Sequence, residues 1–127
     1  MRSLSTSSLL LIFGLTTLSF AQAQIESGKW GANSSTSGYT LDKNSGDRNV
    51  LIEVAFDTPF EVKPNVVLGI TTLDISAGSN VRYSVSTMSV SRDGFTIKIA
   101  TWSVTQIYGI SGSWVAHAKK NMTEGMN

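Results

Sequence analysis

The chain has 127 residues, of which 41% are hydrophobic, 9% aromatic and 15% charged, and it contains no cysteine. This length fits one domain, and the hydrophobic content is too high for a disordered chain. The lack of cysteine excludes a disulfide-stapled domain, a Cys-ligated metal site and a thiol nucleophile. The near balance of ten Lys or Arg against nine Asp or Glu argues against nucleic acid as the main partner.

The first 23 residues have the pattern of a secretory signal peptide. Arg2 provides a positive start, residues 9–20 are apolar and uncharged, and residues 21–23 read Ala-Gln-Ala, a cleavage pattern. An uncleaved anchor helix is disfavoured, because the apolar run is shorter than the ~20 residues that span a bilayer. We therefore expect a secreted chain without membrane insertion. Loss of Arg2 would leave equal numbers of basic and acidic groups.

Beyond the signal peptide, the sequence predicts strands rather than helices. Residues 24–47 are rich in Ser, Gly, Asn and Thr, which predicts an irregular segment that holds one short strand or none. A period of two then begins, with Val50, Ile52, Val54 and Phe56 on one face. Four further strands are predicted within residues 66–74, 81–89, 95–100 and 107–116.

The spacing of these strands indicates the fold class. Short strands separated by Gly, Asn and Asp are typical of an all-β antiparallel sandwich or barrel. We expect one domain over residues 24–118, followed by a flexible polar tail over residues 119–127.

The residues do not favour an enzyme. His117 is the only histidine, it lies beside the predicted tail, and neither a GxSxG serine nor a phosphate loop is present. The sequence leaves open a glycosidase pair among carboxylates such as Asp42, Asp47 and Asp57, because separation in space is not readable from it. We expect a non-enzymatic protein with no metal and no cofactor.

Strand parity places two unusual side chains toward solvent. If Val81, Tyr83 and Val85 face the core, Arg82 points outward, and Trp102 follows with outward parity after the Phe95 strand. Single exposed aromatic side chains are common. The alternative is sugar recognition, in which a ring packs on the C–H face of a sugar while Arg and Asp bind its hydroxyls.

Longer segments carry a family resemblance. They read FDTPFEVKPNVVLGITTLD at residues 56–74, NVR at 80–82, SRDGF at 91–95 and TW at 101–102. In this order, and from about residue 27 to about residue 116, the chain resembles the H-type lectin domain of snail agglutinins and of the discoidin C-terminal module. The resemblance implies a six-stranded antiparallel β-sandwich that forms trimers or hexamers.

The resemblance also implies a binding site. Members of this family bind N-acetylgalactosamine or galactose in shallow sites between protomers. One protomer would contribute Gly46 and Asp47, and the next would contribute Arg82, Trp102 and Tyr108. Asp47 alone could equally be an ordinary turn residue.

Two departures from the family pattern matter. Ser103 stands where well-known members have a histidine that helps to hold the sugar. Glu61 and Ile99 stand near the positions of snail cysteines, so an oligomer would be non-covalent. Two functions follow as expectations: a secreted multivalent lectin that recognises glycans ending in N-acetylgalactosamine or galactose, for cell-surface recognition and agglutination, or an oligomeric adhesion or assembly module that has lost sugar binding.

Overall fold

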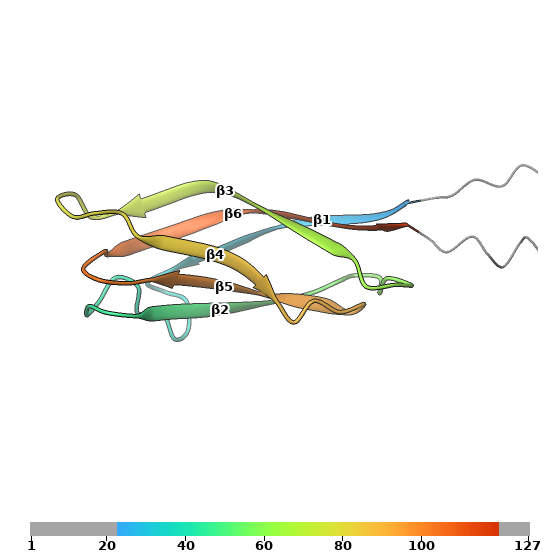
Figure 1. Cartoon of the computed structure of the whole chain (residues 1–127), viewed down its shortest axis with the longest axis horizontal. Coiled ribbons are helices and arrows are strands. Elements are labelled where there is room, and N and C mark those ends of the chain that lie inside the picture. Colours follow the sequence, from blue (N-terminus) through green and yellow to red (C-terminus); the bar gives the residue numbers. More distant parts are fainter. Residues whose placement is uncertain (1–22, 120–127) are drawn as a thin grey trace, which may run out of the picture.

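The structure, a computed structural model, describes residues 23–119. Its six strands are β1 (Ala23–Asn33), β2 (Arg48–Ala55), β3 (Asn65–Ile75), β4 (Tyr83–Met88), β5 (Gly94–Thr101) and β6 (Ile107–Lys119). They pair antiparallel in two sheets, with strand orders β1-β6-β3 and β2-β5-β4. The sheets lie face to face (Figure 1), which confirms the expected six-stranded antiparallel β-sandwich.

The expected processing segments lie almost wholly outside this range. The predicted signal peptide, apart from Ala23, and the predicted tail, apart from Lys119, fall outside the described residues. Ala23 and Lys119 are partners at the ends of β1 and β6, so Lys119 belongs to a strand rather than to the tail. Within residues 23–119, no helix has the length and hydropathy that a membrane crossing needs.

The segment after the predicted signal peptide is more regular than expected. β1 occupies 11 residues and pairs with β6 along its whole length, from Ala23 to Asn33. Its composition hides the strand because few of its residues are β-branched, and pairing with β6 overrides that weak local preference. Trp30 and Ala32 point into the core, whereas residues 34–47 form a loop as expected.

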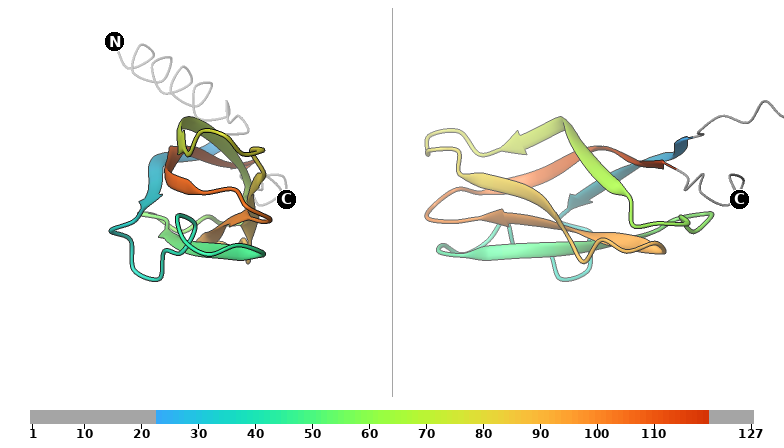
Figure 2. Two further views of the ribbon diagram at one scale, coloured as in Figure 1. Left: turned by 90° about the vertical axis from the view of Figure 1, so that its left-hand side faces the viewer. Right: turned by 45° about the vertical axis from the view of Figure 1, so that its right-hand side comes forward.

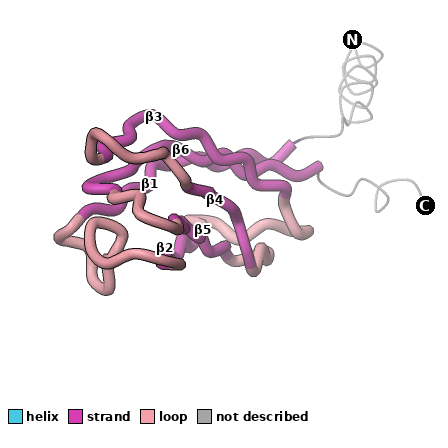
Figure 3. The backbone as a smooth tube through the Cα atoms, turned by 60° about the vertical axis from the view of Figure 1, so that its left-hand side comes forward, coloured by secondary structure: helices cyan, strands magenta, loops and turns pink. Residues whose placement is uncertain are grey.

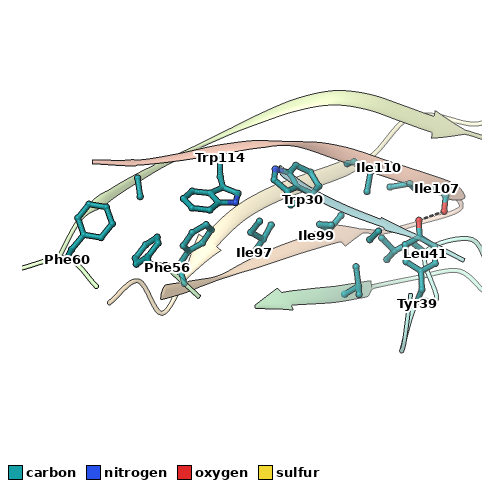
Figure 4. Packing of buried hydrophobic residues seen from close by; sticks show 14 residues of the cluster. Trp30, Tyr39, Leu41, Phe56, Phe60, Ile97, Ile99, Ile107, Ile110 and Trp114 are labelled. Atoms are coloured by element: carbon teal, nitrogen blue, oxygen red, sulfur yellow. Dashed lines mark hydrogen bonds between the residues drawn. The ribbon is translucent and has the colours of Figure 1, made fainter. Parts of the chain in front are cut away.

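The core lies between the two sheets (Figure 4). Phe95, Ile97 and Ile99 of β5 are buried as the alternation predicted. At one end, Phe95 packs edge-on against Trp114, with ring centroids 5.3 Å apart. Phe56 contacts both rings, at 5.7 and 5.8 Å. Aromatic pairs at these separations each contribute roughly 0.5–1.5 kcal/mol beyond burial of their area.

One glycine permits close packing within the first sheet. A Cβ added to Gly112 of β6 would overlap the Gly69 carbonyl oxygen of β3 and would lie 2.9 Å from the Trp30 ring. No real side chain tolerates such contacts, so any other residue at this position would push β3 and β6 apart.

Three loops gather at one end of the sandwich, on the left in Figure 1 and toward the viewer in the left panel of Figure 2. They are the β1–β2 loop (residues 34–47), the β3–β4 loop (76–82) and the β5–β6 loop (102–106). Figure 3 shows them as neighbouring pink segments. We call this the loop end; the described termini, Ala23 and Lys119, lie at the opposite end. Since the three loops connect strands of both sheets, side chains from distant parts of the chain meet there.

Candidate functional site

One buried side chain ties two loops of the loop end together. Arg48, the first residue of β2, is only 7% exposed, and its guanidinium donates hydrogen bonds to five backbone carbonyls. The acceptors are Gly46 (2.9 Å), Lys43 (2.8 Å), Leu41 (3.4 Å), Ser103 (3.0 Å) and Thr105 (2.9 Å). A planar guanidinium holds its donors in a fixed fork, so these bonds set the position of the β1–β2 loop against the β5–β6 loop.

A direct backbone bond reinforces this junction. The Gly46 N–H donates to the Ser103 carbonyl at 2.9 Å. Gly46 has a φ of 83° and Ser103 a φ of 61°, which is an uncommon left-handed conformation for serine. The Ser103 carbonyl accepts from both Gly46 and Arg48, and these two bonds stabilise that conformation. Asp47 is exposed, and it directly follows Gly46, whose bond to Ser103 keeps it beside the Ser103 loop of its own protomer.

Arg82 is held by its backbone and leaves its side chain in solvent. Its N–H donates to the Thr105 hydroxyl at 3.1 Å, and its carbonyl accepts from the Thr101 hydroxyl. The Thr105 hydroxyl in turn donates to the Asn80 carbonyl. Both threonines are buried, so they anchor the β3–β4 loop on β5 and on the loop that follows it.

The expected alternation of side chains between core and solvent from Val81 onward is confirmed only in part. Arg82 is exposed as predicted, but the prediction that Val81 faces the core is wrong, since Val81 is also exposed. The reason is that β4 begins only at Tyr83, so the alternation does not extend back to Val81.

Trp102 has the predicted outward orientation. It follows β5 directly, where Phe95, Ile97 and Ile99 are buried, and Thr101 continues this inward face. The Trp102 side chain is 39% exposed. It thus presents an indole to solvent beside Ser103.

Tyr108 is exposed because of a bulge. Asp74 pairs with Gly109 and Ile75 pairs with Ile107, which leaves Tyr108 as an extra residue on β6. A regular strand would place Tyr108 on the same face as the buried Ile110. Instead, the bulge turns Tyr108 outward, with 47% of the residue exposed.

The start of β6, next to Tyr108, is held in place by the buried side chain of Tyr39. The Tyr39 hydroxyl donates to the Ile107 carbonyl at 2.6 Å (Figure 4), and the Ile107 N–H donates to the Leu41 carbonyl at 2.8 Å. Burial, and then the negative charges of Asp42 and Asp74, raise the pKa of Tyr39 to about 12. The hydroxyl therefore keeps its proton at neutral pH and joins the β1–β2 loop to β6.

The structure thus brings the six residues expected from the resemblance to one end of the sandwich. Five of them lie on the three connected loops, and Tyr108 is the second residue of β6. The five are Gly46, Asp47, Arg82, Trp102 and Ser103. Together they offer a carboxylate, a guanidinium, an indole and a hydroxyl, beside the Tyr108 phenol. These groups suit the binding of a neutral polyol.

Sequence reasoning missed the residues that support this end: Arg48, Thr101, Thr105 and Tyr39. A signal existed for two of them. Arg48 has the parity of Val50 and Ile52, and Thr101 has the parity of Ile97 and Ile99, so both belong to core-facing sets.

No group of three His, Asp or Glu residues within 23–119 could hold a metal ion. His117 is exposed and pairs with Ile25 and Asn65 near the terminal end of the sheet, away from Trp102.

Comparisons with known proteins agree with this architecture. The family model of the H-type lectin domain matches residues 51–117. One of the discoidin-1 polypeptides of Dictyostelium discoideum is 28% identical over 79 residues, which cover 61% of this chain and 31% of that protein. A protein of Fuscovulum blasticum described as ATP synthase subunits region ORF 7 is 29% identical over 72 residues, which cover 57% of this chain and 63% of that protein.

A solved structure shares the fold. Discoidin II of Dictyostelium discoideum superposes with a TM-score of 0.70 at 21% identity, over 82% of this chain and 40% of that one. The chain spans less than two thirds of the length of each of these relatives. The family match covers more than half of the chain and includes Arg82, Trp102, Ser103 and Tyr108. The chain belongs to the H-type lectin domain family, and its β-sandwich is a carbohydrate-binding lectin domain.

Proposed function

We propose that this lectin domain binds glycans ending in galactose or N-acetylgalactosamine at the loop end, without a metal and without turnover. The observation that carries the proposal is the display of Arg82, Trp102 and Tyr108 at one end, on segments that hydrogen-bond to buried side chains. A backbone held in this way loses little conformational freedom when a ligand binds.

Each side chain has a role that suits such a sugar. The Trp102 indole supplies a flat apolar face for the sugar's C–H groups. The Arg82 guanidinium can donate two parallel hydrogen bonds to neighbouring hydroxyls, and the Tyr108 hydroxyl can donate or accept one. Polar groups that exchange water for sugar hydroxyls gain little net free energy, so we expect a Kd of roughly 10 µM to 1 mM for one site.

We further propose that copies associate as a trimer or hexamer, so that Gly46 and Asp47 of one copy complete the site of the next. Apolar side chains in the terminal half of the outer face of the β1-β6-β3 sheet support association, since Ile25, Val67 and Val115 are all exposed there. Val67 and Val115 are direct cross-strand partners, so they form one patch. Several linked sites could strengthen binding to a cell surface by about 10² to 10⁴. Light scattering at micromolar concentration tests this, and a monomer would contradict the composite site.

We also propose that the protein is secreted after cleavage behind Ala23. The A-x-A pattern and the apolar run before it support this. The intact mass of protein recovered from the culture medium of a secreting host should correspond to a chain that begins at Gln24. Retention in the cells at full-length mass would contradict it.

A glycan array at high protein density tests sugar binding. Signals should concentrate on glycans with terminal galactose or N-acetylgalactosamine, and Arg82→Ala and Trp102→Ala should abolish them. Lys63→Ala is a matched control, because it removes an exposed positive charge from the β2–β3 connection at the opposite end. Incubation with simple galactosides should release no reducing sugar; measurable turnover would favour a glycosidase.

A second candidate is an adhesion or assembly module without sugar binding. Val81 and Val104 favour it, since both are exposed beside Arg82 and Ser103 and could pack against a protein partner. In that case the variants Arg82→Ala and Trp102→Ala would keep their partner binding, and the wild-type array would be empty.

A further inference from the structure

A hollow lies on the outer face of the β1-β6-β3 sheet, next to Tyr108. Its volume is about 340 Å³, within the range of roughly 300–1,000 Å³ that is usual for small-ligand sites. Its lining comes from all three strands of that sheet, and Tyr108 belongs to it. The hollow therefore shares Tyr108 with the proposed sugar site.

Small residues on the central strand form its floor. Gly109 of β6 lies between Asn33 of β1 and Asp74 of β3, as their register shows. Ser111 lies in the next outward row, between Gly31 and Thr72. Because Gly109 carries only a hydrogen, and Gly31 and Ser111 are also small, the longer side chains of Asn33 and Asp74 on either side of Gly109 become walls.

The walls carry complementary polar groups. The Asn33 side-chain oxygen accepts from the Ser35 N–H at 2.8 Å, so this bond leaves its two amide donors unused. The Asp74 carboxylate is exposed and offers acceptors on the opposite wall. Two strand spacings of about 4.8 Å separate Asn33 from Asp74 at the backbone. A single pyranose ring can fit between such walls and meet a donor on one side and an acceptor on the other.

We propose that this hollow is a subsite for the sugar unit next to the terminal galactose-type residue of an oligosaccharide. Tyr108 lies between the two subsites and is shared by them. This inference rests on the proposed function, because the terminal sugar must occupy the site at Arg82 and Trp102. The hollow also explains how a shallow lectin site can select among glycans that share one terminal sugar.

Titration calorimetry can separate the subsite from the terminal site. The probes are galactose, N-acetylgalactosamine and a set of di- and trisaccharides that end in either sugar. The protein should be made without N-glycosylation, since Asn33-Ser34-Ser35 is an acceptor sequence. At least one oligosaccharide should bind wild-type protein about tenfold more tightly than its terminal monosaccharide, a gain of about 1.4 kcal/mol.

Two variants should remove that gain and leave monosaccharide binding unchanged. Asp74→Ala removes the acceptor wall. Gly109→Ala raises the floor, and its added Cβ meets its nearest neighbour, the Asn33 Cβ, only at an ordinary 3.7 Å, so the sheet should tolerate it. Glu53→Ala, which removes an exposed carboxylate from the other sheet, is the matched control and should keep the gain.

The possible results distinguish this inference from the proposed function. Persistence of the gain in both Asp74→Ala and Gly109→Ala, or its absence from wild-type protein that binds monosaccharides, would overturn the subsite alone. Failure of folded wild-type protein to bind any probe would overturn the subsite and the proposed function together.

Discussion

The guanidinium Nη2 of Arg48 lies 3.0 Å from the carbonyl oxygen of Ser103, although 55 residues separate them in the chain. Ser103 follows Trp102 directly, so this bond helps to place the indole relative to the Gly46 loop. A charged side chain here serves the backbone of the site rather than the ligand. Such supporting contacts determine whether ligand-binding groups are preorganised.

Replacing Arg48 should therefore destabilise the domain and weaken sugar binding. Arg48→Ala removes the donors of five carbonyls, two of them in the Ser103 loop, and should lower the free energy of unfolding by about 2–4 kcal/mol. Arg48→Lys should fall between wild type and Arg48→Ala, because an ammonium lacks the planar fork. Urea unfolding measures both, and equal stability of wild type and Arg48→Ala would contradict this role.

Substitution of Tyr108 should affect sugar binding, whereas substitution of Ile110 should affect stability, although the two residues lie only two positions apart. Tyr108→Ala removes an exposed ring and should change stability by less than about 0.5 kcal/mol while abolishing sugar binding. Ile110→Ala removes a side chain that is only 2% exposed and should cost about 2–5 kcal/mol. Urea unfolding of the two variants compares these costs. A large stability loss in Tyr108→Ala would indicate that the bulge does not turn the ring outward.

The buried Tyr39 phenol predicts a loss of stability in alkali. Its pKa rises from 10.0 to about 12 on folding, so the folded state retains a proton that the unfolded chain releases. This contribution is complete below pH 10.0 and is lost as the pH rises toward 12. Tyr39→Phe should reduce the dependence of the free energy of unfolding on pH in this window. It should also lower the free energy of unfolding by about 1 kcal/mol at neutral pH, because the bond to the Ile107 carbonyl is lost. Unfolding measured at a series of pH values checks both effects, and an unchanged alkaline slope would contradict the assignment.

Two glycines of β6 provide a packing test. Gly112→Ala should destabilise the domain by more than about 2 kcal/mol, since its methyl group would overlap the Gly69 carbonyl. Gly109→Ala should change stability by less than about 1 kcal/mol, because its methyl group makes only ordinary contacts. Thermal unfolding ranks the two variants, and similar losses in both would contradict the close approach of β3 to β6.

Period-two patterning was sufficient to predict much of this sandwich. Alternation over Val50–Ile52–Val54 and over Phe95–Ile97–Ile99 predicted two strands and the faces that they turn toward the core, and it placed Trp102 outward. It failed where pairing outweighs local preference, as in β1, and where a strand begins later than its pattern, as at Val81.

The binding residues were less accessible to patterning than the strands. A strict alternation would bury Tyr108 with Ile110, and nothing local marks the bulge that exposes it. Its expected role came only from the family resemblance. The pattern does contain Arg48 as an inward-facing residue, but its carbonyl partners come from loops whose positions depend on the whole fold. Long-range hydrogen bonds of this kind have no signature in a single sequence.

The three tryptophans offer the most direct test of sugar binding at the loop end. Trp30 and Trp114 are buried in the core, whereas Trp102 is exposed at the loop end. In ¹⁵N-labelled protein each indole N–H gives one resonance, and a Trp102→Phe variant identifies that of Trp102. On titration with N-acetylgalactosamine, the proposed site predicts a saturable shift of the Trp102 resonance, with those of Trp30 and Trp114 nearly unmoved. Saturable shifts elsewhere with an unmoved Trp102 resonance, or no shift at any concentration up to about ten times the weakest expected Kd, would contradict it.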